Sequence, residues 1–292
     1  MTPFAGKGLI ARRFADVEHS FSTRDTMLYA LGLGCGADPM AEDELRFVYD
    51  EGLAALPTMA VVLGLPGFWL QDADTGADWK RALHGEQGMV LHAPVPTHGT
   101  VVGRTRVVDV IDKGTAKGAF MYSTREIHDK QSGQLIATLT QTTVLRGNGG
   151  FSEGAQQSSR IAPPPPHVLP TRAPDTAVDI DTLPQAALIY RLSGDYNPLH
   201  ADPKVARAAG YPRPILHGLC TFGVAGRALL KACCGNDPGR LRSMAVRFSA
   251  PVFPGERIRT EIWRDGPIAS FRCRIPARDT TVLECGKAEI AG

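Results

Sequence analysis

A stretch rich in glycine, serine and proline, residues 146–175, divides this chain of 292 residues into two halves of similar length. Four consecutive prolines occupy positions 163–166 within it. Glycine leaves a backbone flexible and a proline run holds it extended, so the composition is that of a spacer. We predict an N-terminal unit at 1–147, a linker at 148–175 and a C-terminal unit at 176–292, each of ordinary domain size. We expect few contacts between the two units.

Both units contain runs with the alternating pattern of β-strands. In the N-terminal unit these runs cover residues 100–110, 116–127 and 134–145, and the stretch 88–93 after the tetrapeptide 84–87 is a further candidate. In the C-terminal unit they cover 244–248, 257–263, 268–275 and 280–290. Ile258, Thr260 and Ile262, for example, alternate with charged residues. A period of two places such residues on one face of a sheet.

One long apolar helix is predicted at residues 217–234, where Gly223 and Gly226 would permit close packing against a sheet. Shorter helices are expected at 21–36, 42–49 and 57–64, the last of these buried. Another should run from 182 to 192, with Thr182 and Gln185 forming a capping box. A long helix on a curved antiparallel sheet gives an α+β layering.

The charge balance and the cysteines exclude several classes of protein. Thirty-two basic residues against 30 acidic ones leave a net charge of +2, which gives no reason to expect nucleic acid or an anionic membrane as partner. Six scattered cysteines show no metal-type spacing and indicate reduced thiols in a reducing compartment. We find no signal-peptide pattern and no apolar run of about 18 residues. We therefore expect a cytoplasmic protein.

Residues 190–200 place Asp195, Asn197 and His200 within six positions. On a continuous helix Asp195 and His200 would point roughly 140° apart, so they converge only across a turn, which Gly194 and the Asn197–Pro198 pair can supply. A carboxylate, an amide and an imidazole around one water can perform general acid–base chemistry. The alternative is an Asx-turn that ends a helix beside an incidental surface histidine.

A second segment, residues 211–221, places His217 and Gly218 at the start of the long helix. A glycine amide at a helix N-terminus can donate to a developing oxyanion. For His217 we favour a structural hydrogen-bonding role, because the trio already supplies an acid and a base. A metal site from His200, Asp202 and His217 would match no common zinc spacing, and no cofactor motif is present, so we expect neither metal nor cofactor.

Residues 194–200 (GDYNPLH) and 212–222 (PRPILHGLCTF) resemble the hydratase 2 motif of the (R)-specific enoyl-CoA hydratases, the MaoC-like group. The likeness is strongest to the hydratase domain of the peroxisomal multifunctional enzyme type 2, and it covers most of the chain. It implies a double hotdog fold, two antiparallel sheets each wrapped on a helix. Only the C-terminal half carries the motif, so one active site is expected. The N-terminal half would lack a full central helix and leave room for an acyl chain.

The resemblance implies reversible syn hydration of a trans-2-enoyl-CoA to a (3R)-3-hydroxyacyl-CoA in fatty acyl-CoA metabolism. Asp195 and His200 would hold the water and move its protons, Asn197 would fix the water or Asp195, and the Gly218 amide would polarise the thioester. The resemblance also implies a homodimer. By family position, the residues that bind the acyl-CoA are His84, Gly85, Lys113, Tyr196, Pro198, Leu199 and Phe248.

Three alternatives stay open at this level. A hotdog thioesterase would use a similar carbonyl site and release free CoA thiol. A dehydratase of carrier-protein thioesters would differ only in what holds the pantetheine arm. A non-catalytic acyl-CoA-binding module is disfavoured, because its acid–base set would be idle. Acyl-chain length, branching and pathway are not determined by the sequence.

Overall fold

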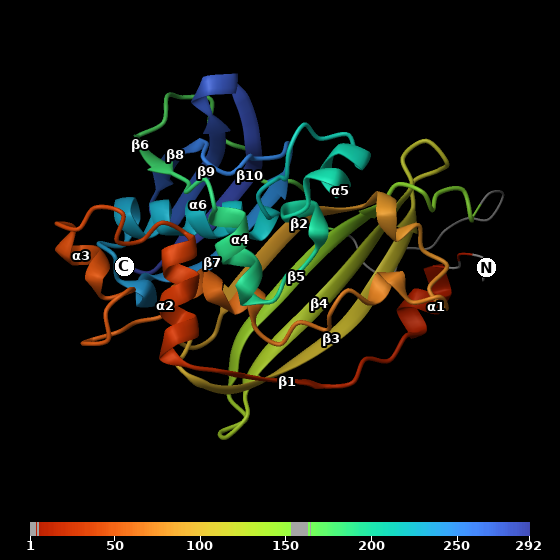
Figure 1. Ribbon diagram of the computed structural model, residues 1–292, viewed down its shortest axis with the longest axis horizontal. Helices are drawn as coiled ribbons and strands as arrows, with labels where there is room; N and C mark the ends of the chain where they lie inside the picture. Colours follow the sequence, from red (N-terminus) through yellow and green to blue (C-terminus); the bar gives the residue numbers. More distant parts are fainter. Residues whose placement is uncertain (1–3, 5, 153–162, 164) are drawn as a thin grey trace.

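The computed structural model describes residues 4, 6–152, 163 and 165–292 and contains one ten-stranded antiparallel sheet (Figure 1). Its strand order is β1-β3-β4-β5-β2-β7-β10-β9-β8-β6. The N-terminal strands are β1 (Val17–Phe21), β2 (Ala82–Leu91), β3 (Gly99–Asp112), β4 (Ala119–Asp129) and β5 (Leu135–Leu145). The C-terminal strands are β6 (Thr176–Asp181), β7 (Leu241–Phe248), β8 (Arg257–Asp265), β9 (Ile268–Ile275) and β10 (Thr280–Ile290). The predicted strand runs are thus confirmed, except that residues 84–87 lie inside β2 instead of preceding a strand.

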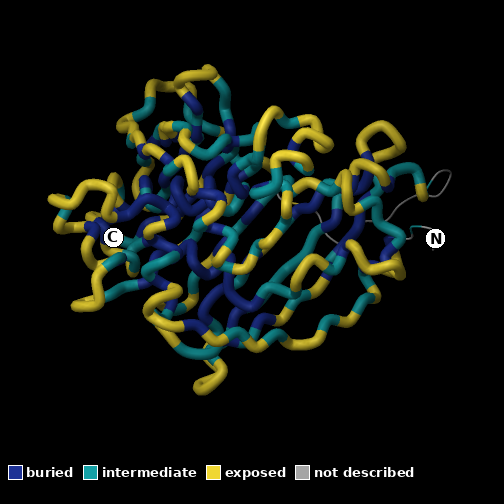
Figure 2. The backbone as a smooth tube through the Cα atoms, in the orientation of Figure 1, coloured by how far each residue is buried: buried dark blue, intermediate teal, exposed yellow. Residues whose placement is uncertain are grey.

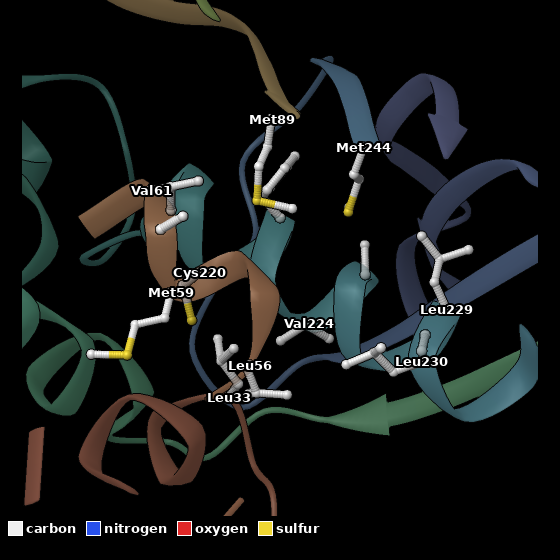
Figure 3. Packing of buried hydrophobic residues seen from close by; sticks show 14 of the residues in the cluster. Leu33, Leu56, Met59, Val61, Met89, Cys220, Val224, Leu229, Leu230 and Met244 are labelled. Atoms are coloured by element: carbon white, nitrogen blue, oxygen red, sulfur yellow. The ribbon is translucent and has the colours of Figure 1, made fainter. Parts of the chain in front are cut away.

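The two halves of the sheet join where β2 pairs with β7, with Glu86 opposite Arg247 and Met89 opposite Met244. This pairing satisfies two strand edges that would otherwise be unpaired. The main hydrophobic core cluster draws on both halves, as the packing of Leu33 and Met59 near Val224 shows (Figure 3). Buried backbone runs through both halves (Figure 2). Our expectation of few contacts between the halves is therefore wrong, because linker composition says nothing about the surfaces it connects. Residues 153–162 and 164 of that linker lie outside the described residues.

Helix α6 (Gly218–Cys233) confirms the predicted long helix and packs between β7–β10 and the N-terminal half. A Cβ on Gly223 would lie 2.7 Å from Leu33, and one on Gly226 would lie 2.5 Å from Thr58. The tightest contacts at these glycines are thus made by Leu33, which directly follows α2 (Thr23–Gly32), and by Thr58 of the 3-10 helix η1 (Pro57–Val62). The sheet that we expected to pack there contributes Met244 of β7, which would lie 3.6 Å from a Cβ on Gly226.

The N-terminal half contains only short helices among its described residues. They are α1 (Gly6–Ala11), α2, α3 (Glu42–Leu45), η1, η2 (Trp69–Gln71) and η3 (Trp79–Arg81). The buried segment predicted at 57–64 is thus a 3-10 helix, and helix α3 is shorter than expected. With α6 in the C-terminal half and no long counterpart in this one, the architecture is a double hotdog with unequal halves.

The chain enters the motif at residues 194–200 through α4 (Ala186–Tyr190) and η4 (Arg191–Ser193), and leaves it through η5 (Pro198–His200) and α5 (Pro203–Ala208). The predicted capping box of α4 is wrong, since Gln185 is the N-cap and makes no side-chain cap. The Thr182 hydroxyl instead donates to the Glu256 carbonyl at 2.8 Å and accepts from the Gly255 amide at 3.0 Å. The remaining short elements are η6 (Pro238–Arg240) and η7 (Pro276–Arg278). No helix in the described parts of the chain is long and apolar enough to span a membrane.

Candidate active site

The motif loop is shaped by its own backbone. Gly194 ends η4 with φ of 117°, a conformation that strains residues with a Cβ. The Asn197 side chain accepts a hydrogen bond from the Leu199 amide at 3.0 Å and so caps η5. The backbone N–H of Asn197 in turn donates to the Asp195 carboxylate at 3.2 Å. This double turn brings Asp195 back towards His200, as the sequence predicts.

Backbone carbonyls orient both imidazoles. His200 Nδ1 lies 2.9 Å from the Ile215 carbonyl oxygen, and His217 Nε2 lies 3.1 Å from the Asp195 carbonyl oxygen. A carbonyl only accepts, so each of these nitrogens carries the proton. His200 Nε2 and His217 Nδ1 are left as lone-pair acceptors. His217 Nδ1 is buried and has no partner among the described residues.

Asp195, His200 and His217 form one cluster, with one potential ligand atom from each lying within 4.8 Å of the other two. His217 therefore has the structural hydrogen bond we expected. Its Nδ1 lone pair, which has no partner in the described parts of the chain, lies near Asp195 and His200. Asp202, which we had considered as a metal ligand, is not in the cluster, since its carboxylate accepts from the Lys204 amide at 2.7 Å and caps α5.

The cluster has the donor types that zinc uses, one carboxylate and two imidazoles. The two rings, however, are stacked, with centroids 3.8 Å apart and planes 28° from parallel. A metal ion needs ligand lone pairs that converge in the ring planes, and nearly parallel stacked rings direct theirs side by side. The arrangement therefore suits hydrogen bonds to a water or a substrate atom better than a metal ion.

Burial keeps the histidines of the site neutral. It lowers the pKa of His200 below 6.5. It lowers the pKa of His217 to about 4, and the neighbouring His200 adds to the effect. Neutral imidazoles at physiological pH can accept a proton from water.

The N-terminal half contributes to the same site through the β2–β7 junction. His84 on β2 meets Phe248 on β7 edge to face, with ring centroids 4.8 Å apart. Phe248 also packs on Gly218, where a Cβ would lie 3.1 Å from the ring. Gly218 is the first residue of α6, so its N–H is among those that a helix leaves unpaired. His84 Nε2 is buried without a partner in the described residues, and burial lowers the pKa of His84 to about 4.

The other predicted binding residues lie around this cluster to different degrees. Tyr196 is 57% exposed, with the Arg191 guanidinium 4.9 Å from its ring centroid, and Pro198 is exposed while Leu199 is half-buried. Gly85 lies in β2, where a Cβ would come within 2.9 Å of Val144. Lys113 is exposed on the β3–β4 loop, and its ammonium lies 5.6 Å from the Phe120 ring centroid.

The sequence analysis did not identify Tyr190 and Arg213 as neighbours of the cluster of Asp195, His200 and His217. Tyr190 packs against His217 at 5.1 Å between ring centroids and against Tyr29 at 5.8 Å. Arg213 borders a recess of about 160 Å³ that reaches His200. No spacing rule joins Tyr29 to Tyr190, because only the packing of α2 on α4 brings them together. The recess is lined by Pro184, Ala187, Leu188, His200, Ala201, Arg213, Pro214 and Pro254.

Two family models match consecutive parts of the chain. The MFE-2 hydratase 2 N-terminal domain matches residues 19–147, and the MaoC like domain matches residues 167–284. The chain is 37% identical to the peroxisomal enoyl-CoA hydratase 2 of Arabidopsis thaliana, over 97% of this chain and 94% of that protein. It is 43% identical to the 3-hydroxyacyl-thioester dehydratase Y of Mycobacterium tuberculosis, over 93% of this chain and 94% of that protein.

Solved structures of similar fold also include a MaoC-like protein. The MaoC-like dehydratase from Phytophthora capsici superposes with a TM-score of 0.84 at 33% identity, covering 98% of both chains. A more distant Mycobacterium tuberculosis protein, described as a double hotdog fold, superposes with a TM-score of 0.56 at 13% identity and supports the fold alone.

Proposed function

The chain belongs to the MaoC-like hydratase 2 family, and on that premise we propose how its residues carry out the reversible hydration of a trans-2-enoyl-CoA to a (3R)-3-hydroxyacyl-CoA. The enzyme is a hydro-lyase. The observation that carries the residue assignment is the cluster of Asp195, His200 and His217 within 4.8 Å, in the half of the chain that holds α6 and Gly218.

The reaction requires a polarised thioester and a held water. As water adds to C3, negative charge develops on the thioester oxygen, and the Gly218 N–H at the positive end of α6 would stabilise it. Water would lie between Asp195 and His200. One of these groups takes a proton from the water as its oxygen bonds to C3. The same proton then passes to C2 on the same face, directly or through the other group, so that both groups end in the protonation states in which they began. His200 would act through Nε2, since Ile215 holds its Nδ1 proton.

Supporting roles follow from the contacts. Asn197 would position Asp195 through its backbone N–H and fix the loop through its side-chain oxygen. Phe248 and His84 would shape the wall opposite Asp195, because their edge-to-face contact lies beside Gly218. Gly85, Lys113, Tyr196, Pro198 and Leu199 complete the proposed acyl-CoA contacts by family position. The division into units at 1–147 and 176–292 with a linker at 148–175 is part of the same proposal.

We propose a homodimer in a reducing compartment such as the cytoplasm. The dimer is implied by the family resemblance, and the compartment by six cysteines that form no disulfide. Light scattering of the purified protein would test the dimer: a monomeric mass across micromolar concentrations would contradict it. Localisation of a tagged full-length protein in its own cell would test the compartment.

The assay that tests the function follows crotonyl-CoA by the loss of its conjugated absorbance, with chiral analysis of the product and a parallel assay for free thiol. We expect loss of the conjugated double bond, a (3R)-hydroxy product and no thiol release. Thiol release at the rate of substrate loss would indicate a thioesterase instead. Matched carrier-protein and CoA substrates would show which carrier the enzyme prefers.

A further inference from the structure

The inward face of the N-terminal sheet is interrupted by a band of polar side chains. The main core cluster includes Met89, Ile127 and Leu139 on this face, and a separate apolar cluster includes Val107, Met121 and Leu145. Residues directly opposite each other on antiparallel strands point to the same side, so the strand register identifies what lies between the clusters. The polar band consists of Thr105, Arg125, Ser123, Gln141, Gln87 and His84.

The register orders this band. Arg125 is opposite Thr105 on one side and Leu139 on the other, while Ser123 is opposite Gln141. His84 pairs with Thr143, which pairs with Met121 on β4. Met121 and Arg125 are four residues apart, roughly 13 Å along a strand. The band therefore leads from His84, beside the proposed active site, to Arg125 deeper in the N-terminal half.

Arg125 is a half-buried cation whose Nε is fully buried, and most of its N–H groups have no partner among the described residues. Its Nη2 donates to the Val61 carbonyl at 2.6 Å, at the end of η1. Its Nε is buried without a partner, and no ion pair joins it to a carboxylate among the described residues. Burial lowers the pKa of Arg125 to about 10, yet the side chain is not fully sealed from solvent. A guanidinium in this state keeps N–H groups that can donate to an acceptor oxygen.

Two other residues of the band are also unsatisfied. Among the described residues, the hydroxyl of Thr105, directly across from Arg125, is buried without a partner, and so is His84 Nε2 at the active-site end. Buried polar groups are normally paired, so a set of unpaired ones along one face calls for a specific occupant. An alkyl chain would leave all three unpaired, whereas a chain with an oxygen at the depth of Arg125 would pair two of them.

We propose that the N-terminal half receives an acyl group that carries an acceptor oxygen well beyond the thioester, with a carboxylate as the strongest case, and that Arg125 binds this oxygen. The inference rests on the proposed hydratase function and specifies its substrate class. Thr105 would add a second hydrogen bond. Arg125 would thus determine specificity without touching the reacting atoms.

The test compares trans-2-enoyl-CoAs of equal length that end in a methyl group, a methyl ester or a carboxylate, over a range of chain lengths. At the length that reaches Arg125, we expect the carboxylate to exceed the methyl-ended chain in kcat/KM. In Arg125→Met this ratio should fall by about tenfold to a hundredfold, the usual effect of a hydrogen bond to a charged group. Because the ratio is taken within one variant, a general loss of activity cancels.

Matched variants sharpen the result. Arg106 lies next to Thr105 but is exposed on the other face, with Nε 2.9 Å from Thr124 Oγ1, so Arg106→Met should leave the ratio unchanged. Arg125→Lys should keep part of the preference, since it retains the charge without the planar fork. If Arg125→Met does not fold, Thr105→Val provides the second probe and should lower the ratio several-fold.

The outcomes separate the two proposals. Wild-type protein that fails to hydrate crotonyl-CoA, which ends before Arg125, would contradict the hydratase function itself. Active protein whose kcat/KM is equal for all three chain ends at every length, or whose preference survives Arg125→Met, would overturn the role of Arg125. Equal preference for ester and carboxylate, lost in Arg125→Met, would support the proposal with a neutral oxygen as the ligand.

Discussion

The imidazole of His217 stacks on that of His200, with ring centroids 3.8 Å apart, while its Nε2 proton bonds to the Asp195 carbonyl oxygen. His217 thus touches both members of the acid–base pair, one through its ring and the other through the backbone. The stack holds His200 in place, and the hydrogen bond holds the loop that carries Asp195.

Isosteric changes at the acid–base pair should abolish most activity without unfolding the protein. We expect Asp195→Asn and His200→Gln each to lower kcat for crotonyl-CoA by about 10²–10⁴, the usual range for a general acid or base. Asp202→Asn and His92→Gln are matched controls, since Asp202 caps α5 and His92 is exposed on the surface. Near-normal turnover in both site variants would contradict the assignment.

Substitution of Gly218 should impair catalysis through crowding. A Cβ there would lie 3.1 Å from the Phe248 ring, so Gly218→Ala must shift either the ring or the start of α6. We expect kcat/KM to fall by about 10²-fold, as misplacement near a reacting centre does. Gly8→Ala is the control, since no described atom lies within 4 Å of its added methyl group. Partial recovery in Gly218→Ala with Phe248→Leu would identify the ring as the cause.

Lowering the pH from 6.5 to 4 should reduce the free energy of unfolding. The pKa values of His84 and His217 are about 4 in the folded protein, because both are buried, against an ordinary 6.5. As pH falls from 6.5 to 4 the unfolded state takes up protons first, so stability that is complete above pH 6.5 is lost across this window. Urea unfolding midpoints measured across it should decline steadily.

The dependence of kcat/KM on pH should likewise show a neutral His200 above pH 6.5. The pKa of His200 is below 6.5, so its neutral form persists down to that pH. We expect kcat/KM to be flat from mildly alkaline pH to about 6.5, with any acid limb from His200 lying lower. An acid limb with its midpoint above pH 6.5 would contradict a lowered pKa of His200, provided that the limb disappears in His200→Gln.

The buried ion pair between α3 and α6 should be a major link between the halves. Arg227 Nη2 lies 2.6 and 2.8 Å from the two Glu44 carboxylate oxygens, and both side chains are largely buried. Arg227→Met would leave the Glu44 charge unpaired, at a cost of about 3–5 kcal/mol in the free energy of unfolding. Adding Glu44→Leu to it should recover much of the loss. The exposed Arg257–Asp181 pair should contribute far less by the same denaturant measurement, because water and salt screen it.

Chelation should leave activity unchanged. The stacked histidines do not direct their lone pairs to one point, so we expect full crotonyl-CoA hydration after dialysis against a strong chelator. If activity is lost on chelation and zinc restores it, the prediction of a metal-independent enzyme is wrong, and Asp195, His200 and His217 would be assigned as metal ligands.

Local sequence determined much of the molecule. Alternating residues identified the strands from β3 to β5 and from β7 to β10, and the run of apolar residues identified α6, because both patterns depend only on near neighbours in the chain. Gly194 and the Asn197–Pro198 pair predicted the turn that joins Asp195 to His200, since turn residues act through their own backbone.

Tertiary structure alone decided what the halves do together. The β2–β7 pairing brings His84 to Phe248, the packing of α2 on α4 brings Tyr29 to Tyr190, and Thr182 leaves its expected cap for the distant Glu256 carbonyl. In sequence Arg125 is an ordinary charged strand residue. Only the register places it on the inner face, where no described carboxylate pairs with it. Such contacts join residues far apart in the chain, where no periodicity or spacing rule operates, and they depend on which surfaces must be buried together.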